Sequence, residues 1–581
     1  MFKKIIGSVR EFKLPTVLTL IFIVGEAIIE TFIPFLTADL VNRFTASGEL
    51  DMPVLLKTGA LLILMAMLSL ACGAIAGFTC AKASAGLARN LRGDIFRKIQ
   101  TFSFGNIDKF SSASLVTRLT TDVANVQMSY MMIIRTAIRS PLMLIFSIAM
   151  AYYMGGLLAT AFVVVIPVLA LGLYFVSRKA MPAFRRVFRK YDKLNESIEE
   201  NVRGMRVVKG FSREEYEKEK FERASDDIRA DFTRAERIVA LNTPLMQFCL
   251  YFNMIFIMLV GARLTIAADA SINVGQISAM LTYGVQILMS LMMLSMIYVI
   301  LTMSAESMRR IAEILDEEPT LTSPENAKTE VKDGSVVFEN VSFKYAADAE
   351  RDTLSRINLR IESGMTVGII GGTGSSKSSL VQLIPRLYDV CEGRVLVGGE
   401  DVRDYDLDTL RHAVSMVLQK NLLFSGTIKD NLRWGDPNAT DEEMIEACKL
   451  AEAHGFITSF PDGYDTKIEQ GGTNVSGGQK QRLCIARALL RKPKILILDD
   501  STSAVDTKTD AHIRAGFRTY IPETTKIIIA QRIASVEDAD LILVLDGGAI
   551  VAQGTHSELL SSCDIYREIH EQQTKGGDFD E

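Results

Sequence analysis

The segment MTVGIIGGTGSSKSSLVQLI, residues 365–384, identifies the fold of the second half of this 581-residue chain. An apolar run typical of a strand leads into a Gly/Ser-rich loop, which leads into a helical pattern. In that setting the loop's N–H groups and the helix N-terminus point at phosphate oxygens. Lys377 is expected to reach the β- and γ-phosphates of a nucleotide, and Ser378 to bind Mg²⁺. We therefore predict a phosphate-binding loop.

One letter of the loop departs from the pattern GxxxxGK[ST], because Ser376 stands where a glycine normally precedes the lysine. The flanking strand and helix still support the assignment. The effect of this serine depends on its backbone dihedral angles. The residues expected to surround the phosphates are Gly371, Gly372, Thr373, Gly374, Ser375, Ser376, Lys377, Ser378 and Ser379.

Further along the chain, KPKILILDD (492–500) is typical of a buried strand that ends in acids. Asp499 is expected to hold Mg²⁺ through water, as the corresponding acid of P-loop NTPases does. Between these two motifs lies NVSGGQKQRLCIARALL (474–490), where a Ser-Gly-Gly turn opens a helix and forms a second anion-binding nest. One phosphate loop and a distant second nest suggest that ATP is held between two such domains arranged head to tail.

The first half of the chain is a membrane domain by its apolar patterning. The chain is 48% hydrophobic and 23% charged, and its mean hydropathy is +0.20. Stretches long enough to cross the hydrocarbon core, none with the alternation of a barrel strand, predict six helices. The glycines of MGG (154–156) separate two of these helices. The two stretches that flank MGG could also form one broken helix. The predicted spans are 15–37, 54–79, 134–155, 157–178, 243–267 and 274–303.

The loops of the first half predict the orientation. The long loops 80–133 and 179–240 are rich in Lys and Arg, whereas the opposite loops are short and poor in cations. The positive-inside rule places both long loops, both termini and everything after residue 303 in the cytosol. Helical spacing predicts that membrane helices extend into these loops. The turns at 111–122 and 209–216 are candidate docking elements for the second half.

Domain boundaries follow from composition. We expect a transmembrane domain at 1–318, opened by a basic amphipathic interfacial helix, a linker at 319–334, a nucleotide-binding domain at 335–575 and a tail at 576–581. Seven scattered cysteines favour reduced thiols over disulfides or zinc. A net charge of −5 with no basic tract argues against a nucleic-acid partner.

Two acids and a group of methionines are candidates for the path of a transported substrate. Glu26 and Glu30 share one helix face inside the first span, where ionisable groups usually face a bundle interior or a water-filled cavity. They are expected either to bind cationic cargo or a proton, or to serve packing and interhelical hydrogen bonds. Flexible thioether side chains suit a surface that repacks around apolar ligands. Methionines that simply face the lipid or the helix-bundle core would give the same sequence pattern equally often. The methionines of the last span are Met289, Met292, Met293 and Met296.

The sequence VSGGQ (475–479), placed between the two nucleotide motifs, resembles the signature of ATP-binding cassette (ABC) proteins. Six spans followed by one cassette resemble an exporter half-transporter. This resemblance implies an all-α membrane domain and a RecA-like α/β cassette with an antiparallel β subdomain and an α-helical subdomain. It also implies that Tyr345 stacks on adenine, that Gln419 contacts Mg²⁺ and that Asp506 communicates across a dimer. Ser476, Gly477, Gly478 and Gln479 would contact a nucleotide held by the partner.

Three positions depart from the family pattern. Asp500 replaces the glutamate that polarises water, Gln531 replaces the histidine at the γ-phosphate, and Gln470 replaces a glutamate ahead of the signature. A general base must reach its proton within hydrogen-bond distance, and Asp500 keeps the charge but loses reach. Gln531 can donate a hydrogen bond but carries no positive charge. We expect ATP–Mg²⁺ to bind in this pocket and to be hydrolysed slowly.

These departures predict one subunit of a heterodimer. The family resemblance implies that it is an ATP-driven exporter of amphipathic compounds such as drugs, lipids or peptides, in a bacterial cell membrane. The second half-transporter would supply the glutamate and the histidine, and this chain would supply Ser476–Gln479. One alternative is a homodimeric exporter with slow turnover. Another is a non-pumping membrane switch that is gated by ATP.

Overall fold

The computed structural model describes residues 2–47, 52–266, 272–346, 349–500 and 505–577. The chain divides into two compact units. The first comprises Met1–Thr101 and Ser111–Glu317, and the second comprises Phe102–Phe110 and Glu318–Glu581. A short segment of the first long loop therefore folds with the second unit, far ahead of that unit in the sequence.

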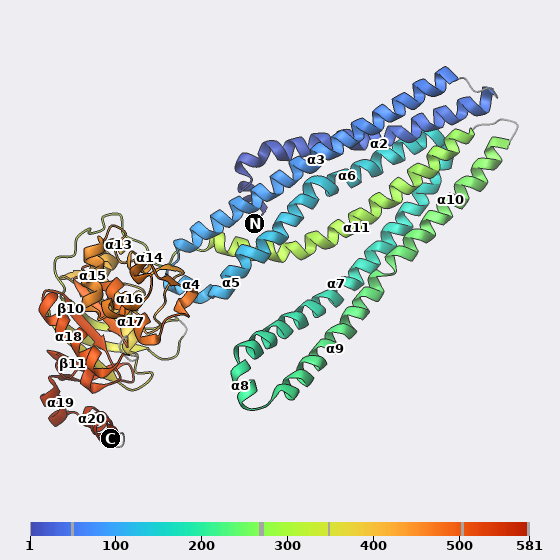
Figure 1. The fold of residues 1–581 in the computed structure, drawn as a ribbon. Coiled ribbons are helices and arrows are strands. Elements are labelled where there is room, and N and C mark those ends of the chain that lie inside the picture. The colour runs from blue at the N-terminus through green and yellow to red at the C-terminus, as the bar shows by residue number, and fades with distance from the viewer. Residues whose placement is uncertain (1, 48–51, 267–271, 347–348, 501–504, 578–581) are drawn as a thin grey trace. The chain divides into compact units, whose positions relative to one another are not determined.

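The first unit is helical throughout the part that the structure describes (Figure 1). Six helices among the described residues are long and apolar enough to cross a membrane, which confirms the predicted number. Several continue beyond any bilayer-spanning length, as the charged loop sequences predicted. The helices are α1 (Phe2–Gly7), α2 (Lys13–Ser47), α3 (Met52–Gln100), α5 (Ser112–Thr117), α6 (Val123–Gly155), α7 (Thr160–Arg203), α8 (Met205–Gly210), α9 (Glu214–Val239), α10 (Asn242–Ile266) and α11 (Val274–Asp316).

The MGG sequence separates two helices rather than breaking one. Helix α6 ends at Gly155, and Gly156 adopts φ 51° and ψ −123°, a conformation that favours glycine. A Cβ at Gly155 would lie 2.6 Å from the sulfur of Met280, so this turn also needs glycine for close packing. The chain then reverses and begins α7 at Thr160.

Within the first unit, α2 lies along α3 and α6 lies along α11, while α7 and α9 run side by side and are joined by α8 (Figure 1). One core cluster includes Ala38, Phe162, Ile257 and Tyr283. The buried hydroxyl of Tyr283 donates a hydrogen bond to the Thr31 carbonyl at 2.8 Å, which satisfies a polar group that would otherwise be costly in this apolar core.

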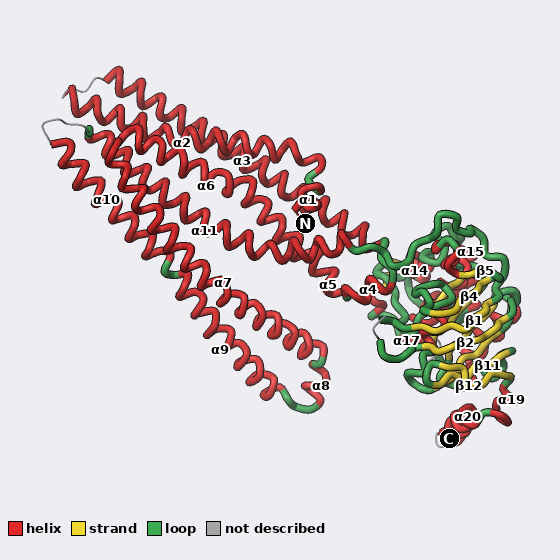
Figure 2. The backbone as a smooth tube through the Cα atoms, turned by 180° about the vertical axis from the view of Figure 1, so that it is seen from behind, coloured by secondary structure: helices red, strands yellow, loops and turns green. Residues whose placement is uncertain are grey.

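The second unit contains two main sheets, seen as yellow strands in Figure 2. The six-stranded sheet has the order β12-β11-β3-β10-β9-β6 and is parallel except for β12. Its strands are β3 (Thr366–Gly371), β6 (Val414–Val417), β9 (Ile495–Asp499), β10 (Thr525–Ile529), β11 (Leu541–Asp546) and β12 (Ala549–Gly554). The second sheet is antiparallel, in the order β2-β1-β4-β5, with strands β1 (Val336–Phe343), β2 (Leu354–Ile361), β4 (Glu392–Val397) and β5 (Glu400–Asp401).

Helices and a small two-stranded sheet complete this unit. The predicted helical subdomain and antiparallel β subdomain are both present. The short strands β7 (Gly426–Thr427) and β8 (Lys467–Ile468) pair with each other. The helices are α12 (Lys377–Gln382), α13 (Leu407–Ala413), α14 (Ile428–Leu432), α15 (Asp441–Leu450), α16 (His454–Ser459), α17 (Gly477–Leu489), α18 (Thr507–Tyr520), α19 (His556–Ser562) and α20 (Asp564–Gly577).

Helix α4 (Phe104–Phe110) is the segment of the first long loop that joins the second unit. The Asn106 amide donates to the Glu318 carbonyl at 3.0 Å, and Ser103 is hydrogen-bonded to Thr320. The Tyr388 hydroxyl donates to Asp108 at 2.8 Å. These contacts attach α4 to both the linker and the cassette.

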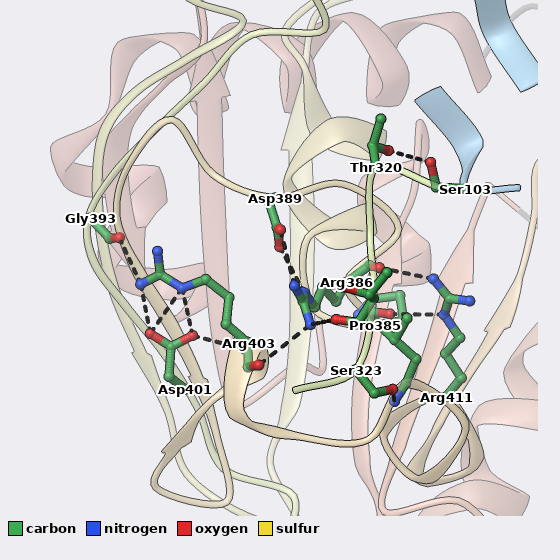
Figure 3. Close-up of polar contacts among 12 residues, drawn as sticks. Ser103, Thr320, Ser323, Pro385, Arg386, Asp389, Gly393, Asp401, Arg403 and Arg411 are labelled. Atoms are coloured by element: carbon green, nitrogen blue, oxygen red, sulfur yellow. Dashed lines mark hydrogen bonds and ion pairs between the residues drawn. The ribbon is translucent and has the colours of Figure 1, made fainter. Parts of the chain in front are cut away.

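A buried arginine, Arg386, forms hydrogen bonds both within the cassette and to the linker (Figure 3). Arg386 donates to Asp389 at 2.8 Å and to the Thr322 carbonyl at 3.3 Å. The Arg411 guanidinium donates at 3.1 Å to the Arg386 carbonyl, and Arg403 pairs with Asp401 (Figure 3). The linker before β1 is therefore held against the cassette by side-chain hydrogen bonds.

Residues 111–122, a candidate docking element by sequence, belong to the first unit, and their docking role stays a prediction. Ser111 breaks the chain direction with φ 54°, so α4 and the helix that follows separate there. Asp122 pairs with Arg310, and Arg118 donates to the Arg310 carbonyl at 2.7 Å, which ties the segment to α11. The turn at 209–216 also lies in the first unit, and its docking role stays a prediction.

Candidate functional site

The nucleotide-site residues follow the carboxyl ends of neighbouring parallel strands. Gly371 ends β3, Asp499 ends β9, and Gln531 comes shortly after β10. Because β10 pairs with both β3 and β9, these ends meet at one edge of the sheet. Ligands of open α/β sheets bind in the crevice at this edge. The topology therefore gathers residues that are far apart in the sequence.

The phosphate loop has the strand–loop–helix arrangement that the sequence predicted. It runs from the end of β3 through Thr373 to α12, which begins at Lys377. The Lys377 ammonium donates at 2.8 Å to the carbonyls of both Gly371 and Gly372. Burial lowers the pKa of Lys377, opposed by the nearby aspartates Asp499 and Asp500. The ammonium is thus curled over its own loop, where a phosphate can replace the carbonyls as its partner.

Ser376 occupies a left-handed backbone conformation, with φ 70° and ψ 24°. This is the conformation for which glycine is normally used, and a residue with a Cβ adopts it at a cost of roughly 1–2 kcal/mol. The serine hydroxyl makes no capping hydrogen bond to α12. The loop therefore keeps its expected shape despite the serine, and the side chain gives no visible compensation.

Replacing Ser376 with glycine is expected to stabilise the cassette by about 1 kcal/mol, since the left-handed strain is relieved while glycine restores some unfolded-state entropy. ATP affinity should stay within about twofold, because a Ser-to-Gly change leaves the loop dihedral angles in place. Thermal unfolding and titration with a fluorescent ATP analogue measure the two effects. Ser376→Ala keeps the strain without the hydroxyl and should show no gain in stability. A loss of stability in Ser376→Gly would mean that the hydroxyl has a stabilising role.

A pair of hard oxygen donors lies beside the loop. The Ser378 hydroxyl donates to Asp499 at 3.0 Å, and both residues come from rigid elements. Burial raises the pKa of Asp499, and the adjacent Asp500 raises it further. Hydroxyl and carboxylate oxygens are the ligands that Mg²⁺ prefers, so this donor set fits the ion. Ser378 and Asp499, with the Gln419 amide oxygen, are the residues that would hold it.

The acid that follows β9 is held by two amides. The Gln531 side chain donates to Oδ2 of Asp500 at 2.7 Å, and Gln419 donates to the same oxygen at 3.4 Å. Asp500 is buried and has φ 48°, a left-handed conformation that aspartate tolerates better than most residues. Two of the three positions that depart from the family pattern, 500 and 531, are therefore in direct contact with each other.

Tyr345 lies beside the phosphate loop with half of its surface exposed. Its hydroxyl is hydrogen-bonded to Ser379 at 2.9 Å and donates to Gln382 at 3.1 Å, so the ring is fixed against α12. Its ring packs edge-on against Tyr388 with centroids 5.1 Å apart. An exposed, positioned ring next to a phosphate loop is suited to stack on a base.

The signature residues form the N-terminus of α17. Ser476 caps the helix by accepting from the Gln479 N–H at 3.3 Å, while the Gln479 side chain accepts from the Ser476 N–H at 2.9 Å. Gly477 and Gly478 are the first helical residues, so their N–H groups have no partner within the helix. This end attracts anions through the helix dipole. Gln470 lies in a short 3₁₀ turn ahead of it.

Asp506 has a structural role that the sequence did not reveal. It caps α18 by accepting a hydrogen bond from the Thr509 N–H at 2.9 Å, and this bond lowers the pKa of Asp506. The cap fixes the residue that the family resemblance assigns to communication across a dimer.

In the first unit, the two acids of α2 share one arginine of α6. Arg139 lies 2.5 Å from Glu30 and 3.5 Å from Glu26. This ion pair is an interhelical contact, which favours the packing role among the alternatives considered for Glu30. Glu26 also lines a cavity of about 330 Å³, in which Met293 and Met296 take part. Met289 and Met292 are not among its lining residues.

Sequence reasoning missed Arg135 and Arg139, both of which line this cavity. They lie one helical turn apart on α6, at the start of the predicted third span. The available signal was a pair of arginines four residues apart inside an apolar run, which predicts two cations on one helix face. It also missed Tyr388, which no motif marks and which contacts both α4 and Tyr345.

Comparison with known proteins places these features in a family. The family model for the ABC transporter transmembrane region matches residues 16–301, and the model for the ABC transporter matches residues 354–503. The chain is 36% identical over 571 residues to the uncharacterized ABC transporter ATP-binding protein YfiB of Bacillus subtilis, covering 98% of each chain. It is 33% identical over 479 residues to a fatty acid ABC transporter ATP-binding/permease protein of Mycobacterium bovis, covering 82% of this chain and 75% of that protein.

A solved structure shares the fold. The structure of a bacterial Atm1-family ABC exporter with ATP bound superposes with a TM-score of 0.83 at 24% identity, covering 97% of this chain and 98% of that one. The helical unit and the cassette define a membrane-spanning ATPase coupled to transport. The chain belongs to the ABC transporter family, as a half-transporter with one transmembrane region and one cytoplasmic nucleotide-binding domain.

Proposed function

We propose that this chain is the slowly hydrolysing subunit of a heterodimeric exporter of amphipathic compounds. The observation that carries the proposal is the contact between Asp500 and Gln531, at 2.7 Å. A general base needs a free lone pair within hydrogen-bond reach of the attacking water. Here the shorter carboxylate accepts from two amides, and the neutral Gln531 cannot supply positive charge at the γ-phosphate.

Binding of ATP does not depend on that base. The loop N–H groups and the Lys377 ammonium would hold the phosphates, and Tyr345 would stack on adenine. Ser378, Gln419 and Asp499 would hold Mg²⁺, which neutralises phosphate charge when bound. The pocket then retains nucleotide and keeps the two cassettes of the dimer together between turnovers.

The signature helix supports a partner with a competent pocket. ABC exporters work as dimers of half-transporters, so the capped N-terminus of α17 is available to a second chain. Ser476 keeps its capping bond, and the glycines after it leave room for a phosphate. The partner would contribute its own phosphate loop, glutamate and histidine. Hydrolysis would then occur between the partner's loop and Ser476–Gln479 of this chain.

The cargo class is supported by the membrane unit. The cavity beside α11 combines apolar methionine walls with charged groups, which suits molecules with an apolar and a polar part. A relative named as a fatty acid transporter supports a lipid-like cargo.

Purified alone, the chain is expected to bind ATP–Mg²⁺ but to release phosphate about 10²-fold more slowly than the complex with its partner. Affinity purification from the native membrane identifies that partner, and phosphate release with fluorescent-nucleotide titration measures both properties. Lys377→Ala is the control for binding, because it removes the ammonium at the phosphates.

Two results would overturn the proposal. Rapid phosphate release by the chain alone would show a competent homodimer. Full biological activity of the complex with a non-hydrolysable ATP analogue, without uphill movement of a dye in vesicles, would show an ATP-gated switch.

A further inference from the structure

The cavity in the first unit lies between helices α2, α6 and α11, and one arginine of its wall forms no ion pair among the described residues. Its volume is about 330 Å³, at the lower end of the range for small-molecule sites. Glu26, Arg135 and Arg139 supply its charged wall. The sequence alone draws attention to the two acids and therefore to cationic cargo.

The structure favours the packing alternative for these acids, because they already have a cationic partner. Arg139 lies 2.5 Å from Glu30 and 3.5 Å from Glu26, and only 13% of the Glu26 side chain is exposed. A Cβ at Gly73 on α3 would lie 3.3 Å from the Glu26 carboxylate, so a neighbouring helix closes tightly over this acid. Both carboxylates are therefore engaged with Arg139 in a closely packed contact, which leaves little room for a cationic ligand.

Arg135 is in the opposite situation. It lies one turn before Arg139 on α6 and is exposed within the cavity wall. Across the described residues its guanidinium forms no ion pair with a carboxylate. A Cβ added at Gly77 of α3 would lie 3.9 Å from the guanidinium. Space beside the guanidinium is therefore left open.

The rest of the cavity is apolar. Met293, Met296 and Ile297 of α11 form its opposite wall, and the two methionine side chains are 42% and 56% exposed. Flexible thioethers adapt to alkyl chains of different shape. A guanidinium in a mainly apolar region normally has an anionic partner, and none is present for Arg135 among the described residues.

We propose that this cavity binds the acidic head group of an amphipathic cargo, with Arg135 as the residue that pairs with its carboxylate or phosphate. The alkyl part of the cargo lies along Met293, Met296 and Ile297. The bound anion supplies Arg135 with the carboxylate or phosphate partner that it lacks among the described residues. This assignment rests on the proposed export function, since it names the cargo class for that transporter.

Equilibrium binding of a dansyl-labelled undecanoic acid to the full chain in lipid nanodiscs tests the assignment, with protein-free discs subtracted. The methyl ester of the same probe is the neutral comparison. Arg135→Gln is expected to weaken binding of the acid about 10- to 100-fold, because a charge-assisted hydrogen bond is lost. Arg135→Lys should retain most of the affinity, and the ester should bind all variants equally. Arg263→Gln removes an exposed arginine of α10 and should change nothing. An alkyl phosphate probe that competes with the acid distinguishes phosphate from carboxylate preference.

Two results would overturn the assignment: equal binding of acid and ester to the unaltered chain, or an equal loss of both in Arg135→Gln. These measurements need no nucleotide and no partner. If the acid binds through Arg135 and no ATP-dependent movement follows, the cavity assignment stands and the export function fails. If transport occurs but acid binding does not depend on Arg135, the export function stands and the cavity assignment fails.

Discussion

The double substitution Asp500→Glu with Gln531→His is expected to raise phosphate release from this chain's own pocket about 10²-fold or more. Glutamate restores the reach of the base, and histidine replaces the amide that now donates to Asp500 at 2.7 Å. Each single substitution should give a smaller gain, since the two side chains contact each other and their effects are coupled.

The measurement is made in the assembled complex after the partner's pocket has been silenced by replacing its phosphate-loop lysine. Phosphate release then reports only the pocket of this chain. The left-handed φ of 48° at Asp500 disfavours glutamate slightly, so thermal unfolding is measured alongside. An unchanged rate with intact ATP binding would show that the limiting defect lies elsewhere, for example at Ser376.

The second large effect is expected at the signature. Ser476→Arg should reduce phosphate release by the assembled complex at least about 10²-fold, because the arginine fills the space in front of the α17 N-terminus, where the partner's nucleotide would bind. Asp500→Asn should change the total rate only modestly, since its pocket already contributes little. Steady-state phosphate release by the complex measures both.

Loss of the helix cap is a competing explanation, because Ser476 accepts from the Gln479 N–H. Ser476→Asp separates the two explanations: aspartate caps a helix well but places a negative charge against the nucleotide phosphates. Both variants should be inactive if Ser476 faces a phosphate, and only the arginine variant if the cap alone matters. The reverse ranking, in which Asp500→Asn is the more damaging change, would mean that the two pockets have been assigned in the wrong order.

Much of the fold was predictable from local sequence patterns. A membrane span requires a long apolar run, and a phosphate loop requires glycines and a lysine between a strand and a helix, so each leaves a continuous signal. The ends of β3 and β9 could be placed together because parallel strands expose their carboxyl ends at the same edge.

Features that depend on contacts between distant residues were not predictable. The pair formed by Glu30 and Arg139 joins residues 109 positions apart, and nothing in either local pattern names the other. The left-handed conformation of Ser376 is a property of backbone angles. Nor did any local pattern show that the short helix Phe104–Phe110, far ahead of the cassette in the sequence, folds with the second unit.

The path of the backbone has a consequence for how this protein can be cut into parts. The chain enters the second unit at residue 102, leaves it after 110 and returns at 318, so three peptide links join the units. A protease nick within the 319–334 linker would give two fragments with no covalent connection, and α4 would remain on the N-terminal fragment while still contacting the cassette through the hydrogen bond from Tyr388 to Asp108. A recombinant cassette that starts at residue 335 would lack the polypeptide that contacts Tyr388. The continuous sequence of the cassette, 335–575, is therefore shorter than the compact second unit, which also includes residues 102–110 and the linker.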